Sequence, residues 1–255
     1  MTVKDLLDLA QNLHRQALDA YTYRQIIRQY RDNLKEYSKE MRYSSAFYSV
    51  IYQSLHESLM MCLVKIYDWN TSTLTIRILK ENISLISLKD MDHQIQEMYG
   101  INNVFCHELR PCEEVYFLLE VESTKKIYEV LGEEYRCTHI DLTLDQMKEL
   151  YIQRFKYLQD ANVIHNMMKR RNKIYAHNDQ EVNFDFKTVG EKYPLNYDEV
   201  DALIEFALDF TDFVIWILTG KYPGRHISNM DDWKWTLDMV RVAEKHKRYR
   251  PYTKQ

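Results

Sequence analysis

Residues 143–179 read TLDQMKELYIQRFKYLQDANVIHNMMKRRNKIYAHND and carry the clearest helical pattern of the chain. Thr143 and Gln146 form a capping box, in which two side chains bond the first free N–H groups of a helix. Apolar residues then recur every three or four positions, which is typical of one buried helical face. Continued by the same steps, this face reaches Arg171, so the pattern predicts one long helix with an arginine on its inner side. The face comprises Leu144, Met147, Tyr151, Phe155, Leu158, Ala161, Ile164 and Met168.

The composition favours helices throughout. Glycine and proline number only 5 and 4 among 255 residues, so few residues interrupt a helix. A second capping box, Asn196 with Glu199, predicts a helix that ends at Gly220. These patterns predict an all-α protein that folds as a single domain over residues 1–255. Further helices are expected at about 4–39, 47–69, 74–88, 112–131 and 228–248, and a short extended piece at 184–189.

The predicted inner face of the helix after the second capping box is equally regular. It comprises Val200, Leu203, Ala207, Phe210, Val214 and Ile217. The helix at 47–69 is expected to bury a face that comprises Phe47, Ile51, Leu55, Leu59, Cys62, Ile66 and Trp69.

The charge balance narrows the classes of function. The net charge is −4 and the pI about 6.2, so any contact with nucleic acid has to be local. No signal-like apolar core opens the chain and no apolar run is long enough to span a bilayer, so we expect a cytoplasmic protein with no membrane partner. A phosphate-cradling glycine loop is also missing, which argues against nucleotide hydrolysis.

Positive charge is densest in the segment 169–173, KRRNK, and a histidine follows at His177. Arginine offers a planar fork of donors for phosphate oxygens, and histidine exchanges protons near neutral pH. This pairing is suited to RNA chemistry. The alternative is structural, because cations and histidine in the last turn of a helix complement its dipole and Asn178 or Asp179 commonly ends a helix.

The residues Arg171, Asn172 and His177, with Ala176 and Asp179 beside them, resemble the motif of the HEPN superfamily of helical RNA-cleaving and RNA-binding domains. The segment Leu63–Asp68, running into 74–85, is similar to the abortive-infection branch of AbiU type. The resemblance covers about 45–220. It implies a HEPN-like helical bundle with additional helices at 1–40 and 228–250.

The resemblance also implies a function, a metal-independent endoribonuclease in phage defence or acting as a toxin. Arg171 would stabilise charge on the phosphate, His177 would act as acid or base, and Asn172 would orient His177 or bond the phosphate. Two protomers would bring their motifs together, and an antitoxin protein is a further expected partner. A non-catalytic RNA-binding or scaffold protein of the same fold is the alternative. The residues expected to contact RNA are Lys169, Arg170, Lys173 and Asp179.

Two further features bear on regulation and on metals. HEPN toxins silenced by nucleotide addition carry a tyrosine two residues after the histidine, whereas this chain has Asp179, so we do not expect that modification. The scattered ligands Cys106, His107, Cys112, Cys137 and His139 fit no paired zinc spacing. We therefore predict neither a metal site nor a cofactor.

Overall fold

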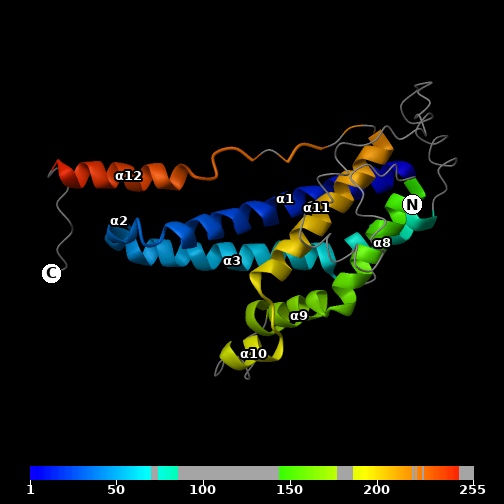
Figure 1. Ribbon diagram of the computed structural model, residues 1–255, viewed down its shortest axis with the longest axis horizontal. Helices are drawn as coiled ribbons and strands as arrows, with labels where there is room; N and C mark the ends of the chain where they lie inside the picture. The colour runs from blue at the N-terminus through cyan, green and yellow to red at the C-terminus, as the bar shows by residue number, and fades with distance from the viewer. Residues whose placement is uncertain are drawn as a thin grey trace, which may run out of the picture. The chain divides into compact units, whose positions relative to one another are not determined.

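The computed structural model describes residues 1–69, 74–85, 144–176, 186–219, 221, 223–225 and 227–246. All regular elements in these ranges are helical, which confirms the predicted all-α fold (Figure 1). None of the described helices is both long and apolar enough to cross a bilayer. The helices within residues 1–85 are α1 (Val3–Asn33), α2 (Ser38–Met41), a short 3₁₀ turn η1 (Arg42–Ser44), α3 (Ser45–Tyr67) and α4 (Ile76–Leu85). They are followed by α8 (Leu144–Asp160), α9 (Val163–Arg170), a π-helical turn η3 (Arg171–Ala176), α10 (Phe186–Lys192), α11 (Tyr197–Thr219) and α12 (Asp232–Lys245).

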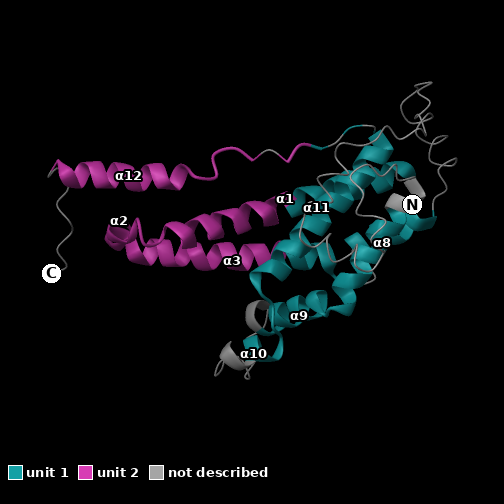
Figure 2. Cartoon of the chain, viewed as in Figure 1, with its two compact units in different colours: residues 1–17, 63–223 teal, residues 18–62, 224–255 magenta. Residues whose placement is uncertain are grey.

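The chain divides into two compact units (Figure 2). Unit 1 comprises residues 1–17 and 63–223, and unit 2 comprises residues 18–62 and 224–255. Helices α1 and α3 therefore each supply one end to each unit. The expectation that the whole chain folds as one domain stays a prediction.

Helix α11 is the central element of unit 1. Its capping box forms as predicted, because the Asn196 N–H donates to Glu199 Oε2 at 2.7 Å and the Glu199 N–H donates to Asn196 Oδ1 at 2.8 Å. All six residues of its predicted inner face are buried. Burial extends over nearly every residue from 203 to 218, so this helix is enclosed by others instead of lying on a surface.

Aromatic side chains fill the contact between α8 and α11. The ring centroid of Tyr151 lies 4.9 Å from that of Phe213 and 5.4 Å from that of Phe210. Phe155 reaches Phe206 at 5.6 Å. Rings at these separations stabilise a core beyond their burial alone. The predicted inner face of α8 is confirmed at Tyr151, Phe155 and Leu158, all of which are buried.

The first half of α1 also belongs to this core, although the sequence places residues 1–40 in a flanking helix. Leu6, Ala10, Leu13 and Ala17 are each at most 1% exposed. They recur at steps of three and four, so one face of α1 is buried in unit 1.

Two buried polar contacts lie on α11. Arg154 of α8 donates from Nη1 to Asp209 Oδ2 at 2.6 Å, and both side chains are at most 4% exposed. Three residues further on, Asp212 lies 3.0 Å from His14 Nδ1 of α1. Tyr67 donates to the backbone carbonyl of Leu203 at 2.6 Å, and burial raises the pKa of its hydroxyl well above 10.0. The apolar run of α11 thus carries polar contacts to three neighbouring helices.

The structure corrects several expectations of detail. The segment 74–88 is helical as predicted, in α4, but residues 186–192 form helix α10 where an extended piece was predicted. Phe47 and Trp69 are 60% and 46% exposed, so the expected buried face of α3 holds only toward its C-terminal end, at Leu59 and Ile66. The predicted helix at 112–131, Thr143 of the first capping box, and the scattered cysteine and histidine ligands lie outside the described residues.

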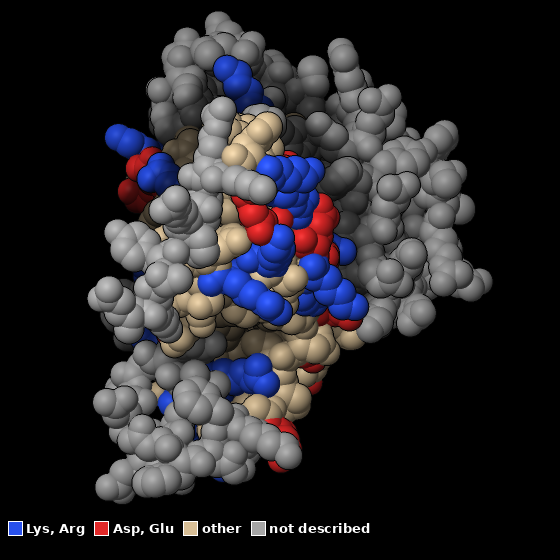
Figure 3. Space-filling model, turned by 90° about the vertical axis from the view of Figure 1, so that its left-hand side faces the viewer, with Lys and Arg blue, Asp and Glu red and all other residues tan. Residues whose placement is uncertain are grey.

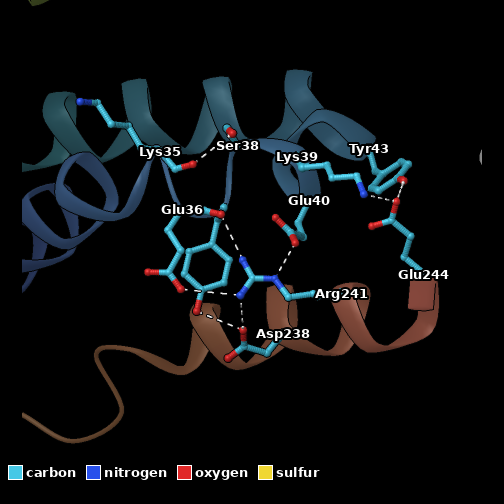
Figure 4. Close-up of polar contacts among 10 residues, drawn as sticks. Lys35, Glu36, Ser38, Lys39, Glu40, Tyr43, Asp238, Arg241 and Glu244 are labelled. Carbon is cyan, nitrogen blue, oxygen red and sulfur yellow. Dashed lines mark hydrogen bonds and ion pairs between the residues drawn. The ribbon is translucent and has the colours of Figure 1, made fainter. Parts of the chain in front are cut away.

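Unit 2 is held by aromatic stacking and by a polar network. Tyr30 and Tyr37 place their rings 5.9 and 6.0 Å from that of Trp233 on α12, over a small core of Tyr37, Met41 and Leu237. Arg241 of α12 points at the α1–α2 segment and donates to Glu40 Oε1 at 2.7 Å and to the Glu36 carbonyl at 3.1 Å (Figure 4). The hydrogen bond from Arg241 lowers the pKa of the buried Glu40 carboxyl below 4.5.

Charges at the α2 and α12 side of the chain are of both signs. Lysine and arginine side chains of the described residues lie beside aspartate and glutamate side chains in this view (Figure 3). One such pair is Lys39 and Glu244, whose Nζ and Oε1 atoms lie 2.6 Å apart (Figure 4).

Replacing Asp209 by alanine is expected to destabilise the protein by about 3–5 kcal/mol, because the change leaves the Arg154 guanidinium buried without its counter-ion. The matched control is Asp198→Ala in the exposed first turn of α11, where loss of a favourable dipole interaction costs about 0.3–1 kcal/mol. Urea unfolding followed by circular dichroism measures both. Equal losses for the two variants would show that the buried pair does not hold the core.

Candidate functional site

The predicted site lies at the end of α9 and in the π-helical turn that follows it. Lys169 is exposed, whereas Arg170, Arg171, Asn172 and Lys173 are partly exposed. His177 and Asp179 lie outside the described residues, so the structure gives no distance from them to Arg171. Their assignments stay predictions.

A break between α8 and α9 decides how the motif is presented. The single long helix predicted over 143–177 is wrong, because Asn162 adopts φ 59° and ψ 12°, in the left-handed region. A continuous helix cannot pass through that conformation, and asparagine tolerates it better than most residues. The chain therefore changes direction after Asp160, and α9 starts afresh at Val163.

Helix α9 is amphipathic. Val163, Ile164 and Met167 are at most 4% exposed and anchor it to unit 1. On another side, Asn166 Nδ2 donates to the carbonyl of Pro194 at 2.9 Å. Two features of α9 thus fix the position of the motif. One is the burial of its three apolar side chains, and the other is the contact of Asn166 with the segment between α10 and α11.

Arg170 holds that segment more strongly. Its Nε donates to the Tyr193 carbonyl at 2.7 Å, and its Nη1 and Nη2 donate to the carbonyls of Leu195 and Gly190 at 3.3 Å each. Carbonyls at the C-terminal end of a helix carry partial negative charge, and a guanidinium satisfies them well. The contacts of Arg170 are therefore those of a residue that holds α10 and the start of α11 against α9.

Arg171 has a different environment. Its backbone N–H is shared between the carbonyls of Met167 and Met168, where the α-helix gives way to the π turn. Its Nη1 donates to Asn172 Oδ1 at 2.8 Å, while its Nε is buried and has no partner among the described residues. A buried donor left unpaired costs about 1–3 kcal/mol, so an acceptor that reached this nitrogen would relieve that cost.

The π turn itself is informative. Its hydrogen bonds run from residue i to residue i+5, which makes it less common than the α-helix, and such turns occur frequently at functional sites. Here the turn begins at Arg171 and includes Asn172 and Lys173. The motif residues therefore follow a local change of helical geometry that the sequence pattern did not predict.

Sequence reasoning also missed the buried polar residues of unit 1. Arg154, Asp209 and Asp212 were not singled out, although each is at most 6% exposed. A signal existed, because acidic residues inside an apolar run such as 206–217 are almost never fully buried unless they are paired. Their contacts support the fold around the candidate site.

Comparison with known proteins gives one finding that covers most of the chain. A family model described as AbiU2, of the HEPN class, matches residues 4–236. This match confirms the resemblance to the AbiU-type branch and extends it beyond 45–220 in both directions. Neither the curated proteins nor the solved structures give a significant match.

Replacing Arg170 by alanine is expected to lower the free energy of unfolding by about 2–3 kcal/mol, because three charge-assisted contacts to carbonyls are lost. Arg171→Ala is the matched neighbour and should change stability by less than about 0.5 kcal/mol, since it also removes an unpaired buried donor. Thermal unfolding measures the difference, and amide hydrogen exchange at residues 190–195 should accelerate only in the Arg170 variant. Equal stability of the two variants would contradict this division.

Proposed function

Because the chain belongs to the HEPN AbiU2 family, we propose that it is a metal-independent endoribonuclease that acts on RNA in phage defence or as a toxin. Its site comprises Arg171, Asn172 and His177. The observation that carries the proposal is the buried Nε of Arg171, which has no partner among the described residues and belongs to a guanidinium whose Nη1 already donates to Asn172.

The reaction is an internal displacement at phosphorus. The RNA 2′-hydroxyl loses its proton and attacks the adjacent phosphorus, and the bond to the 5′-oxygen breaks as that oxygen gains a proton. The products are a 2′,3′-cyclic phosphate and a 5′-hydroxyl. His177 transfers the protons, because an imidazole titrates near neutral pH. Arg171 stabilises the charge that develops on the phosphate oxygens.

Asn172 supports Arg171 in this scheme. Its Oδ1 accepts from Arg171 Nη1, so the amide fixes the plane of the guanidinium before a phosphate arrives. A pre-oriented donor loses less entropy on binding than a mobile one. Orientation of His177 by Asn172 stays a second proposal, since His177 lies outside the described residues.

The other positively charged residues of the motif differ in exposure and in the contacts they make, and therefore in how well they could bind RNA. Lys169 is exposed and Lys173 partly so, which is suited to phosphates along a bound strand. Arg170 is a weaker candidate for RNA binding, because its guanidinium already donates to three backbone carbonyls. Asp179 stays a predicted RNA contact.

The proposal includes partners and a location. A second copy of the chain would bring its own motif to the same RNA, and an antitoxin protein would restrain the activity. The enzyme would act in the cytoplasm, on cellular RNA.

One observation favours a different function. Arg170 serves the fold and the net charge is −4, so the motif offers less positive charge to RNA than its sequence suggests. A non-catalytic scaffold of the same fold is therefore the second candidate. It predicts no RNA cleavage by the purified protein.

The rate at which the purified protein cleaves total cellular RNA distinguishes the endoribonuclease from the non-catalytic scaffold. Arg171→Ala is expected to slow cleavage about 100- to 1,000-fold, the usual effect of removing a donor to transition-state charge. His177→Ala should slow it about 100- to 10,000-fold, as expected for loss of an acid or base. The matched control is Arg28→Ala, an exposed arginine of α1 in unit 2, which should leave the rate unchanged. Parental rates in both motif variants would refute the assigned site.

The reaction should also survive chelation of divalent metal ions. In excess EDTA we expect the same rate and products that end in a 2′,3′-cyclic phosphate, detected by the sensitivity of the 3′ end to acid. Loss of cleavage in EDTA that is restored by a divalent ion would refute the metal-independent mechanism.

A further inference from the structure

Helix α12 of unit 2 carries two different faces. One face docks on the α1–α2 segment through Trp233, Leu237 and Arg241. Leu237 is 1% exposed, and Trp233 Nε1 donates to Gln29 Oε1 at 3.2 Å. Arg241 completes the docking through Glu40 (Figure 4). The contacts of this face therefore hold α12 against the α1–α2 segment.

The opposite face carries three exposed apolar side chains. Trp235, Met239 and Val242 are 68%, 49% and 47% exposed. With exposed Asp232 before them and exposed His246 after them, they recur at steps of 3, 4, 3 and 4. That alternation is the spacing of the a and d positions at which two helices pack knobs into holes.

The same face is charged at its two ends, with opposite signs. Asp231 and Asp232 are exposed at the start of α12, and Lys245 and His246 at its end. Met239 lies seven residues from Asp232 and seven from His246, so the face is symmetric about its centre. A second α12 lying antiparallel would set each acidic end beside a basic end. A parallel copy would bring like charges together.

We propose that this face of α12 binds a second copy of the chain, as an antiparallel helix pair centred near Met239. Across a two-fold axis the same patch meets itself, so a self-complementary face is what such a contact requires. The family match ends at residue 236, inside α12, so Asp232 and Trp235 lie within it whereas Met239 and Val242 lie beyond it. The proposal is independent of ribonuclease activity.

The chemistry favours a protein partner over a membrane. Two exposed aspartates at one end of the face would be repelled by anionic lipid headgroups. The contact is also small. A helix of 14 residues is about 21 Å long and buries less than the about 800 Å² per partner of a standard interface. We therefore expect a reversible dimer, populated at about 100 µM and dissociated at about 1 µM.

Sedimentation equilibrium of the full chain tests the surface. The average mass of the parent should double between about 1 µM and about 100 µM, whether the species at the lower concentration is the 30.9 kDa chain or a pair joined at the motif. Val242→Glu should weaken association at least tenfold, because it places a charge in the apolar part of the contact, about one helical turn from its centre at Met239. The matched control is Val50→Glu, a 63% exposed valine of α3 in the same unit, which should leave association unchanged.

A charge exchange tests the orientation. Asp232→Lys should weaken the dimer, and adding Lys245→Glu in the same chain should restore it, because opposite charges then meet again across the axis. A parent that stays monomeric would overturn the proposal, and so would a dimer indifferent to Val242→Glu or equally weakened by Val50→Glu. Failure of the double variant to recover would overturn the antiparallel arrangement. Binding of the parent to anionic phospholipid vesicles that Val242→Glu abolishes would assign the face to a membrane instead.

Discussion

The ion pair between Arg154 and Asp209 is the constraint on which the rest of unit 1 depends. Two opposite charges lie 2.6 Å apart inside a core rich in aromatic side chains, and separating them would remove the contact that offsets the cost of burying each charge. The pair therefore fixes α8 against α11 in one register. His14 Nδ1 of α1 lies 3.0 Å from Asp212 Oδ1, on the next turn of α11, and 3.2 Å from the hydroxyl oxygen of Thr211. We interpret these contacts as selecting one arrangement of the helices. Apolar residues of similar volume in their place would often give a protein of equal stability.

The packing of α8 on α11 determines where the candidate site lies. Once α8 is fixed on α11, the left-handed Asn162 redirects the chain, and two consecutive arginines follow, Arg170 at the end of α9 and Arg171 at the start of the π-helical turn. Consecutive residues of a helix point about 100° apart, so the two guanidinium groups reach different surroundings. Arg170 meets the carbonyls of the α10–α11 segment, whereas Arg171 meets only Asn172 among the described side chains and keeps a buried N–H unpaired. The fold thus uses one arginine and leaves its neighbour available for an anion.

Local signals in the sequence predicted well, and non-local contacts did not. The capping box at Asn196 and Glu199 and the inner face of α11 follow from short spacings, and both are confirmed. The break at Asn162 was missed because the apolar repeat continues across it. The structural role of Arg170 was not predicted, since the carbonyls to which it donates lie 20 to 25 residues further along the chain. The assignments of His177 and Asp179 stay predictions from the motif.

The most direct test of this division is the salt dependence of RNA binding. A single-stranded RNA with 2′-O-methyl groups cannot be cleaved, so its affinity can be measured from low to moderate salt for the parent, Arg171→Ala and Arg170→Ala. Each lost phosphate contact reduces the slope of log K against log salt by about 0.7 for single strands. The account predicts that reduction for Arg171→Ala and an unchanged slope for Arg170→Ala. An unchanged slope for Arg171→Ala would contradict the claim that Arg171 binds phosphate.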